Sequence, residues 1–158
     1  KIQDEGSVRQ LVKRGLEGTY SNMIGDAILA DIEKELKRVC AKHGLEYQKN
    51  VRIPKLDRAV SFVLESPTKP KLILDVSYSD TTSSSQGSKK EDARKTAAVI
   101  KAERDAGNNI IFVNFLDGAG WIGRQADLRE IHRCSDYVLN FQNMGLLEDI
   151  IDAHIDEL

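Results

Sequence analysis

The 158-residue sequence has few of the residues that cross-link small proteins or carry them into membranes. It contains two cysteines, Cys40 and Cys134, and no CxxC pair, so it predicts neither a disulfide framework nor a zinc site. No apolar run is long enough to span a bilayer, and the N-terminus lacks the apolar stretch of a signal peptide. We therefore expect a cytoplasmic protein with reduced thiols and no membrane partner.

A strong charge of one sign and the usual nucleotide-binding motifs are also missing. The formal net charge is −2, and the sequence contains no GxGxxG and no GxxxxGK[ST] motif. Basic residues nevertheless concentrate between positions 34 and 58 and between positions 89 and 104, whereas the C-terminal tail is acidic. Two interpretations stay open: the basic groups face a phosphate backbone, or they are the solvated sides of helices.

Apolar periodicity predicts one α/β domain over residues 1–158, either complete or part of a longer chain, because no Met begins it. Spacings of three and four predict a short helix over 7–14 that ends at Gly15, and a longer one from the N-caps Ser21 and Asn22 to Gly44. Further helices are expected over 91–106 and 125–133 and from about 146. Strands are expected over 45–53, 59–64, 71–78, 110–116 and 137–140.

This order of elements predicts a three-layer α/β/α sandwich with a mixed central sheet, in which the first three strands form a meander. Residues 59–64 and 71–78 should be adjacent antiparallel strands, because prolines bracket the turn between them. The third strand should be central, since its apolar run is almost continuous. The serine-rich segment 79–88 is expected to be a long surface loop.

Two aspartates stand out because they interrupt apolar strands. Asp57 immediately precedes the second strand, and Asp75 is embedded in the third. A charge within a buried strand is costly unless it is paired or bound to a metal, so Asp75 requires a partner. Paired aspartates at one sheet edge would provide the oxygen ligands that Mg²⁺ prefers, which favours phosphodiester hydrolysis. The alternative is a structural Asp75, hydrogen-bonded to a loop or paired with a lysine.

The wider pattern around these aspartates resembles a known family. The segment GSKKEDARK at 87–95 and the turn DGAGW at 117–121 are its most specific pieces. Together with Asp57, the strand end DVSY at 75–78 and the final DYVLN at 136–140, they are similar to DpnII/MboI-type restriction endonucleases of the PD-(D/E)xK class. The resemblance covers about residues 21 to 150.

The resemblance implies a restriction-endonuclease-like fold, double-stranded DNA as substrate, Mg²⁺ as cofactor and a homodimer. Asp57 and Asp75 match the first and second acidic residues, and Asp31 or Glu35 on the N-terminal helix would lend a further metal ligand. Position 75 has Asp where Glu is usual, and Ser77 replaces the usual Lys or Asn. The missing cation could come from Lys71, Lys89 or Lys90, with Lys89 taken as the catalytic candidate. The candidate DNA-binding residues are Ser85, Gly87, Ser88, Lys89, Lys90 and Arg94.

Two other functions stay open beside site-specific cleavage. One is a nuclease-like domain without activity that only binds DNA or a protein, which the weakened Asp75-x-Ser77 motif favours. The other is a structure-selective repair nuclease on the same fold. Two residues of the DGAGW turn have simpler roles: Trp121 should anchor the helix that follows, and Asp117 should be a turn residue.

Overall fold

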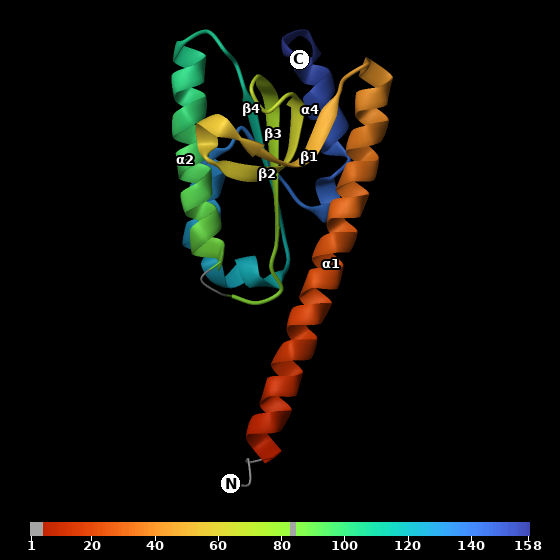
Figure 1. Cartoon of the computed structure of the whole chain (residues 1–158), viewed down its shortest axis with the longest axis vertical. Coiled ribbons are helices and arrows are strands. Elements are labelled where there is room, and N and C mark those ends of the chain that lie inside the picture. The colour runs from red at the N-terminus through yellow and green to blue at the C-terminus, as the bar shows by residue number, and fades with distance from the viewer. Residues whose placement is uncertain (1–4, 83–84) are drawn as a thin grey trace.

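The computed structural model describes the backbone of residues 5–82 and 85–158 and the side chains of residues 22–82 and 85–158. The chain runs from one long helix through a three-stranded meander to a C-terminal helix, and the order of elements after the first helix is the predicted one (Figure 1). The elements are α1 (Glu5–His43), β1 (Tyr47–Ile53), β2 (Arg58–Glu65), β3 (Pro70–Tyr78), α2 (Ser85–Asp105), β4 (Ile111–Asp117), α3 (Gln125–Cys134), β5 (Tyr137–Leu139) and α4 (Leu146–Ala153).

The sheet is mixed, with the strand order β1-β2-β3-β4-β5. The strands β1, β2 and β3 pair antiparallel, and Phe62 of β2 lies opposite Leu74 of β3. This pairing confirms the predicted hairpin. The pairs β3–β4 and β4–β5 are parallel, so helices must carry the chain across the sheet between them. The central position of β3 is confirmed as well.

Two hydrophobic clusters, one on each face of the sheet, make the structure a three-layer sandwich. On one face, Ile32 and Leu36 of α1 and Ile151 of α4 pack against the sheet. On the other face, Ile100 of α2 and Ile131 of α3 do the same. The two pairs of helices therefore cover opposite faces, as Figure 1 shows for α1 and α2. This is the predicted α/β/α arrangement, consistent with a restriction-endonuclease-like sandwich.

The structure differs from the sequence prediction at two helix boundaries. A single helix α1 runs through Gly15 and the predicted caps Ser21 and Asn22, and its N-terminal half extends beyond the sheet (Figure 1). The helix α2 begins at Ser85 rather than at Glu91, so the predicted loop over 79–88 is shorter; its positions 83 and 84 lie outside the described residues. No helix in the described part of the chain is long and apolar enough to cross a membrane.

Candidate functional site

Asp75 is the carboxylate most deeply set in the sheet among the predicted site residues, and its partner is Arg58. The Arg58 Nη2 atom lies 2.5 Å from Oδ2 of Asp75, and Nη1 lies 3.2 Å from Oδ1. The two side chains are only 15% and 17% exposed. This bidentate arrangement matches the planar guanidinium to the planar carboxylate, which makes it stronger than a surface ion pair. The pairing of Asp75 is therefore with an arginine, where the sequence suggested a lysine.

Three elements bring this pair together on the face of the sheet that α2 and α3 cover. Asp75 lies two residues after Ile73, which faces α2 and α3, and alternation places Ser77 on the same face. Arg58 begins β2 and also donates from Nη2 to the Thr96 hydroxyl of α2, at 2.5 Å. Thr96 is fully buried and donates its own proton to the Asp92 carbonyl at 2.8 Å. Strand, neighbouring strand and helix are thus joined through one guanidinium.

A second polar residue lies beside Asp75 on the adjacent strand. Asn114 of β4 is the direct parallel partner of Asp75 and is 6% exposed. Its amide donates to the Ser135 hydroxyl at 2.8 Å, and that hydroxyl donates to the Ile131 carbonyl at 2.6 Å. Asp75 and Asn114 therefore form a polar pair across two central strands, beside the apolar residues Ile73 and Phe112 on this face.

Asp57 lies next to the cluster in sequence but makes a different ion pair. It ends a short 3₁₀ turn with φ of 54°, and its side chain is 87% exposed and contacts Arg52. Only its neighbour Arg58 reaches Asp75, so the two aspartates are held by separate arginines. In the part of the chain whose side chains are described, no three His, Cys, Asp or Glu residues form a ready-made metal site.

The carboxylates of α1 lie on the other face of the sheet. Asp31 is exposed, and Glu35 accepts from Arg38 at 2.7 Å. The apolar side of this helix packs into the cluster shared with α4, whereas Asp75 faces α2. The structure therefore does not bring Asp31 or Glu35 to Asp75.

The predicted DNA-binding residues all fall in the first three turns of α2, and they differ in what they contact. Lys90 lies 2.8 Å from Asp127 of α3, and Arg94 lies 3.1 Å from Glu130. Lys89 and Ser88 are exposed, and Lys89 makes no ion pair with any described side chain. Lys89 is thus the basic residue of this group whose charge remains available to a ligand.

The contacts of Asp127 explain why Lys90 is less available. Asp127 is 7% exposed. The hydrogen bond from the Lys90 ammonium, and to a lesser extent the one from Arg124, lower the pKa of Asp127, whereas burial acts in the opposite direction. Gly87 also belongs to this junction, because a Cβ atom there would lie 3.1 Å from Nη2 of Arg124. Lys90 and Gly87 therefore join α2 to α3.

Most of the basic group between residues 34 and 58 is likewise paired. Arg38 and Lys42 of α1 reach Glu148 of α4 at 2.5 and 2.8 Å. Lys49 pairs with Glu33, and Lys55 with Glu103. The acidic C-terminal helix thus neutralises part of the predicted basic surface.

The segment after β3 is fixed by residues that composition alone would assign to a linker. Gln86 is 1% exposed and donates to the Ser79 hydroxyl at 2.9 Å and to the Thr81 carbonyl at 3.0 Å. Gly118 has φ of 105°, and a Cβ atom there would lie 2.0 Å from the Ser79 carbonyl oxygen. The loop after β3 and the DGAGW turn after β4 therefore pack backbone to backbone, which holds the carboxyl ends of both strands together.

The simpler predictions for the DGAGW turn are confirmed. Trp121 is 4% exposed within the cluster beneath α2 and α3. Asp117 accepts from the Gly118 amide at 2.7 Å and from the Phe141 amide at 2.7 Å. Both residues are accounted for by the structure of the turn.

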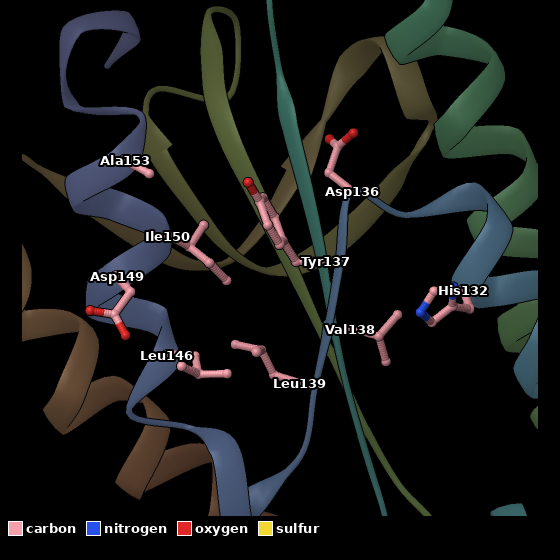
Figure 2. A pocket seen from close by; sticks show the side chains of 9 residues that line it. All are labelled: His132, Asp136, Tyr137, Val138, Leu139, Leu146, Asp149, Ile150 and Ala153. Carbon is pink, nitrogen blue, oxygen red and sulfur yellow. The ribbon is translucent and has the colours of Figure 1, made fainter.

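A groove of about 420 Å³ lies at the other edge of the sheet, along β5 and α4. Its floor is mainly apolar, with Tyr137, Leu139, Leu146 and Ile150 converging on it and Asp149 at its rim (Figure 2). None of the predicted site residues lines it. The groove is therefore separate from the Asp75 cluster.

Sequence reasoning missed Arg58, although it directly follows Asp57. A signal was present: a buried aspartate on one strand requires a cation, and an arginine stands at the start of the adjacent antiparallel strand. The register, with Phe62 opposite Leu74, leaves position 58 outside the residues paired between β2 and β3, and the long arginine side chain spans the remaining distance to Asp75. The sequence interpretation named a lysine as the partner of Asp75, whereas the structure pairs Asp75 with Arg58.

Comparison with known proteins gives one family. Residues 8–154 match the family described as the BanI C-terminal domain, which spans nearly the whole chain. Neither the curated proteins nor the solved structures contain a significant match. The family match supports the broader part of the resemblance seen in the sequence, a relationship to restriction endonucleases.

Proposed function

The chain belongs to the BanI C-terminal domain family, which is related to restriction endonucleases, and from this premise we propose that it is a Mg²⁺-dependent endonuclease of the PD-(D/E)xK class, DpnII/MboI-type, that cleaves double-stranded DNA at a specific site. The observation that supports the proposal most is the placement of Asp75. This carboxylate sits on the central strand at the position that the resemblance gives to the second acidic residue, and Asp57 precedes the adjacent strand.

The donor set fits Mg²⁺ in its chemistry. Asp57 and Asp75 offer hard carboxylate oxygens, and the 87% exposure of Asp57 leaves room for the waters that this ion retains. These two residues would hold the ion, which when bound would polarise the scissile phosphate and lower the pKa of the attacking water. In the present arrangement Arg52 and Arg58 contact the same carboxylates. The two guanidinium groups would therefore compete with a bound ion for these oxygens.

The residues of the chain itself would position the substrate and balance its charge. In hydrolysis the attacking water releases a proton to solvent and its oxygen bonds to phosphorus as the bond to the sugar oxygen breaks, and the leaving oxygen takes up a proton from solvent. The phosphate carries extra negative charge as this happens, so a nearby cation stabilises the transition state. Position 77 has no cation, but its Ser hydroxyl shares the face of Asp75 and can donate a hydrogen bond to the phosphate.

The first turns of α2 are the proposed DNA contact. Ser85, Ser88 and Lys89 are exposed there, next to the loop that follows Asp75-x-Ser77 on β3. Lysine and serine side chains contact backbone phosphates without reading sequence, so this helix would set the position of the duplex. Cleavage of both strands of a symmetric site would further require a homodimer, which light scattering of the protein with and without DNA can test.

A binding function without cleavage is the second candidate, and one observation favours it. Arg58 already satisfies both oxygens of Asp75, which is the arrangement expected of a structural ion pair. Such a domain would still bind DNA through α2. It would show no cleavage with any divalent ion.

Incubation of the protein with plasmid DNA and Mg²⁺ separates these functions. We expect discrete fragments, and we expect Asp57→Asn to lower the rate by roughly three powers of ten or more, as loss of metal activation would. Metal-free binding should be unchanged or tighter, because a negative charge is removed. Asp105→Asn, an exposed carboxylate at the end of α2, is the matched control. Smeared products would indicate a structure-selective nuclease, and binding without cleavage would indicate the second candidate.

A further inference from the structure

The guanidinium of Arg58 uses nearly all of its hydrogen-bonding capacity in this structure. Its two terminal nitrogens contact both oxygens of Asp75, the Ala59 carbonyl at 3.2 Å and the Thr96 hydroxyl. The remaining donor, Nε, is buried and has no hydrogen-bond partner among the described residues. Four of its five N–H groups therefore have acceptors, two of them the oxygens of Asp75, and one donor is left unsatisfied.

Removal of only one partner of the Arg58–Asp75 ion pair is energetically unfavourable. The pair is more than four-fifths buried, so removal of the cation alone would strand a carboxylate in the sheet, and removal of the carboxylate alone would strand a guanidinium. A divalent ion can compensate the stranded carboxylate, and a phosphate can compensate the stranded guanidinium. Arginine binds phosphate in the same bidentate geometry as carboxylate, so exchange between the two preserves its hydrogen bonds.

We propose that Arg58 is an exchangeable positioning residue: it holds Asp75 when DNA is absent and passes to a backbone phosphate when DNA binds, which frees Asp75 for the metal ion. This inference rests on the proposed function and adds the order of events at that site. The cation that position 77 lacks is then supplied from β2 by Arg58. Metal and DNA binding are coupled, because each ligand takes one partner of the same ion pair.

Metal affinity without DNA tests this exchange independently of cleavage. We expect the wild-type protein to bind Mn²⁺ weakly in calorimetry and to bind it about tenfold or more tightly with a duplex that carries non-hydrolysable phosphates. Arg58→Gln should bind Mn²⁺ without DNA about tenfold more tightly than wild type, and DNA should then add little. Arg133→Gln, which removes an exposed arginine from Glu130 within α3, should behave as wild type.

Two further variants keep the test decisive if Arg58→Gln does not fold. Arg58→Lys retains the charge but not the paired hydrogen bonds, and Thr96→Val removes the hydroxyl that anchors the guanidinium. Both should shift DNA-free Mn²⁺ affinity in the same direction by a smaller factor. A wild-type protein that cleaves DNA, with folded variants that bind Mn²⁺ no more tightly than it does, would overturn the exchange alone. A wild-type protein that neither cleaves DNA nor binds Mn²⁺ in its presence would instead overturn the proposed nuclease function.

Discussion

Replacement of Asp75 by Asn should destabilise the protein, whereas the same change at Asp57 should not. Asp75 is 15% exposed and forms a two-point ion pair with Arg58. Asp57 is 87% exposed and contacts one exposed arginine, Arg52, at the surface. The two variants are chemically identical changes in opposite environments, so their difference isolates the contribution of burial.

The magnitude follows from the structure. Loss of one partner of a buried pair costs about 3–5 kcal/mol, and the remaining exposure of Arg58 together with the acceptor oxygen kept by Asn reduces this to about 2–3 kcal/mol. For a chain of this length each kcal/mol lowers the melting temperature by roughly 2–4 °C, so Asp75→Asn should melt roughly 5–10 °C below wild type. An exposed pair contributes at most about 1 kcal/mol, so Asp57→Asn should melt within about 3 °C of wild type.

Thermal unfolding and urea titration followed by circular dichroism would measure both variants. Arg58→Gln should destabilise by a similar amount. The double variant with Asp75→Asn should cost less than the sum, because each single change leaves the other charge buried and unpaired whereas the double variant leaves neither. An Asp75→Asn protein with the urea midpoint of wild type would refute the structural importance of the pair. The cleavage assay on this variant has to be run well below its melting temperature, which is why Asp57→Asn is the cleaner probe of metal binding.

Three other features give direct tests. Gly118→Ala should destabilise far more than Gly107→Ala in thermal melts; both positions have positive φ, but only at Gly118 would the new Cβ atom meet backbone, 2.0 Å from a carbonyl oxygen. Arg38, with a neighbouring lysine, lowers the pKa of Glu148 from 4.5 to about 2. Since the folded-state pKa is the lower one, this stabilisation is complete above pH 4.5 and is lost as pH falls towards 2, and Glu148→Gln should flatten the acid-unfolding curve there. Burial raises the pKa of Cys40 to about 11, so at pH 8 a thiol reagent should modify it only after denaturant is added.

The order of elements could be predicted because local patterns and tertiary packing agree along most of the chain. The run from Leu72 to Leu74 is apolar because β3 is covered on both faces, and the structure places it in the centre of the sheet. Disagreement arose where a local signal was weak. A glycine such as Gly15 costs a helix only about 1 kcal/mol, which is too little to end one as long as α1.

The start of α2 was mispredicted for a different reason. Serine and glycine dominate residues 83–88, and composition of this kind is typical of linkers. The beginning of the helix at Ser85 is held by side-chain contacts to the preceding loop, chiefly the hydrogen bonds from Gln86 to Ser79 and Thr81. Such side-chain contacts have no periodic signature, so they become visible only in the folded loop between β3 and α2.

At the candidate site, the sequence identified a candidate functional residue but not the residue that it pairs with. Asp75 could be singled out from sequence, because a lone charge in an apolar strand is rare and demands compensation. Arg58 could not be assigned to it, since the pairing depends on the register of two strands and on a hydroxyl from α2. Sequence thus identified the acidic residue and left its partner open.

Ion pairing also changes how the charge distribution bears on DNA binding. Arg38 and Glu148 are 110 residues apart in sequence, yet they form one of the pairs that neutralise the predicted basic group. Exposed pairs of this kind contribute about 0–1 kcal/mol, less than a cation gains from a phosphate when counterions are released. The paired cations can therefore exchange their carboxylate partners for DNA phosphates at little cost in free energy, while Lys89 has no ion pair with a described side chain to break. Binding that weakens steeply with salt but survives Lys89→Glu would mean that these exchangeable pairs, rather than the start of α2, carry the contact.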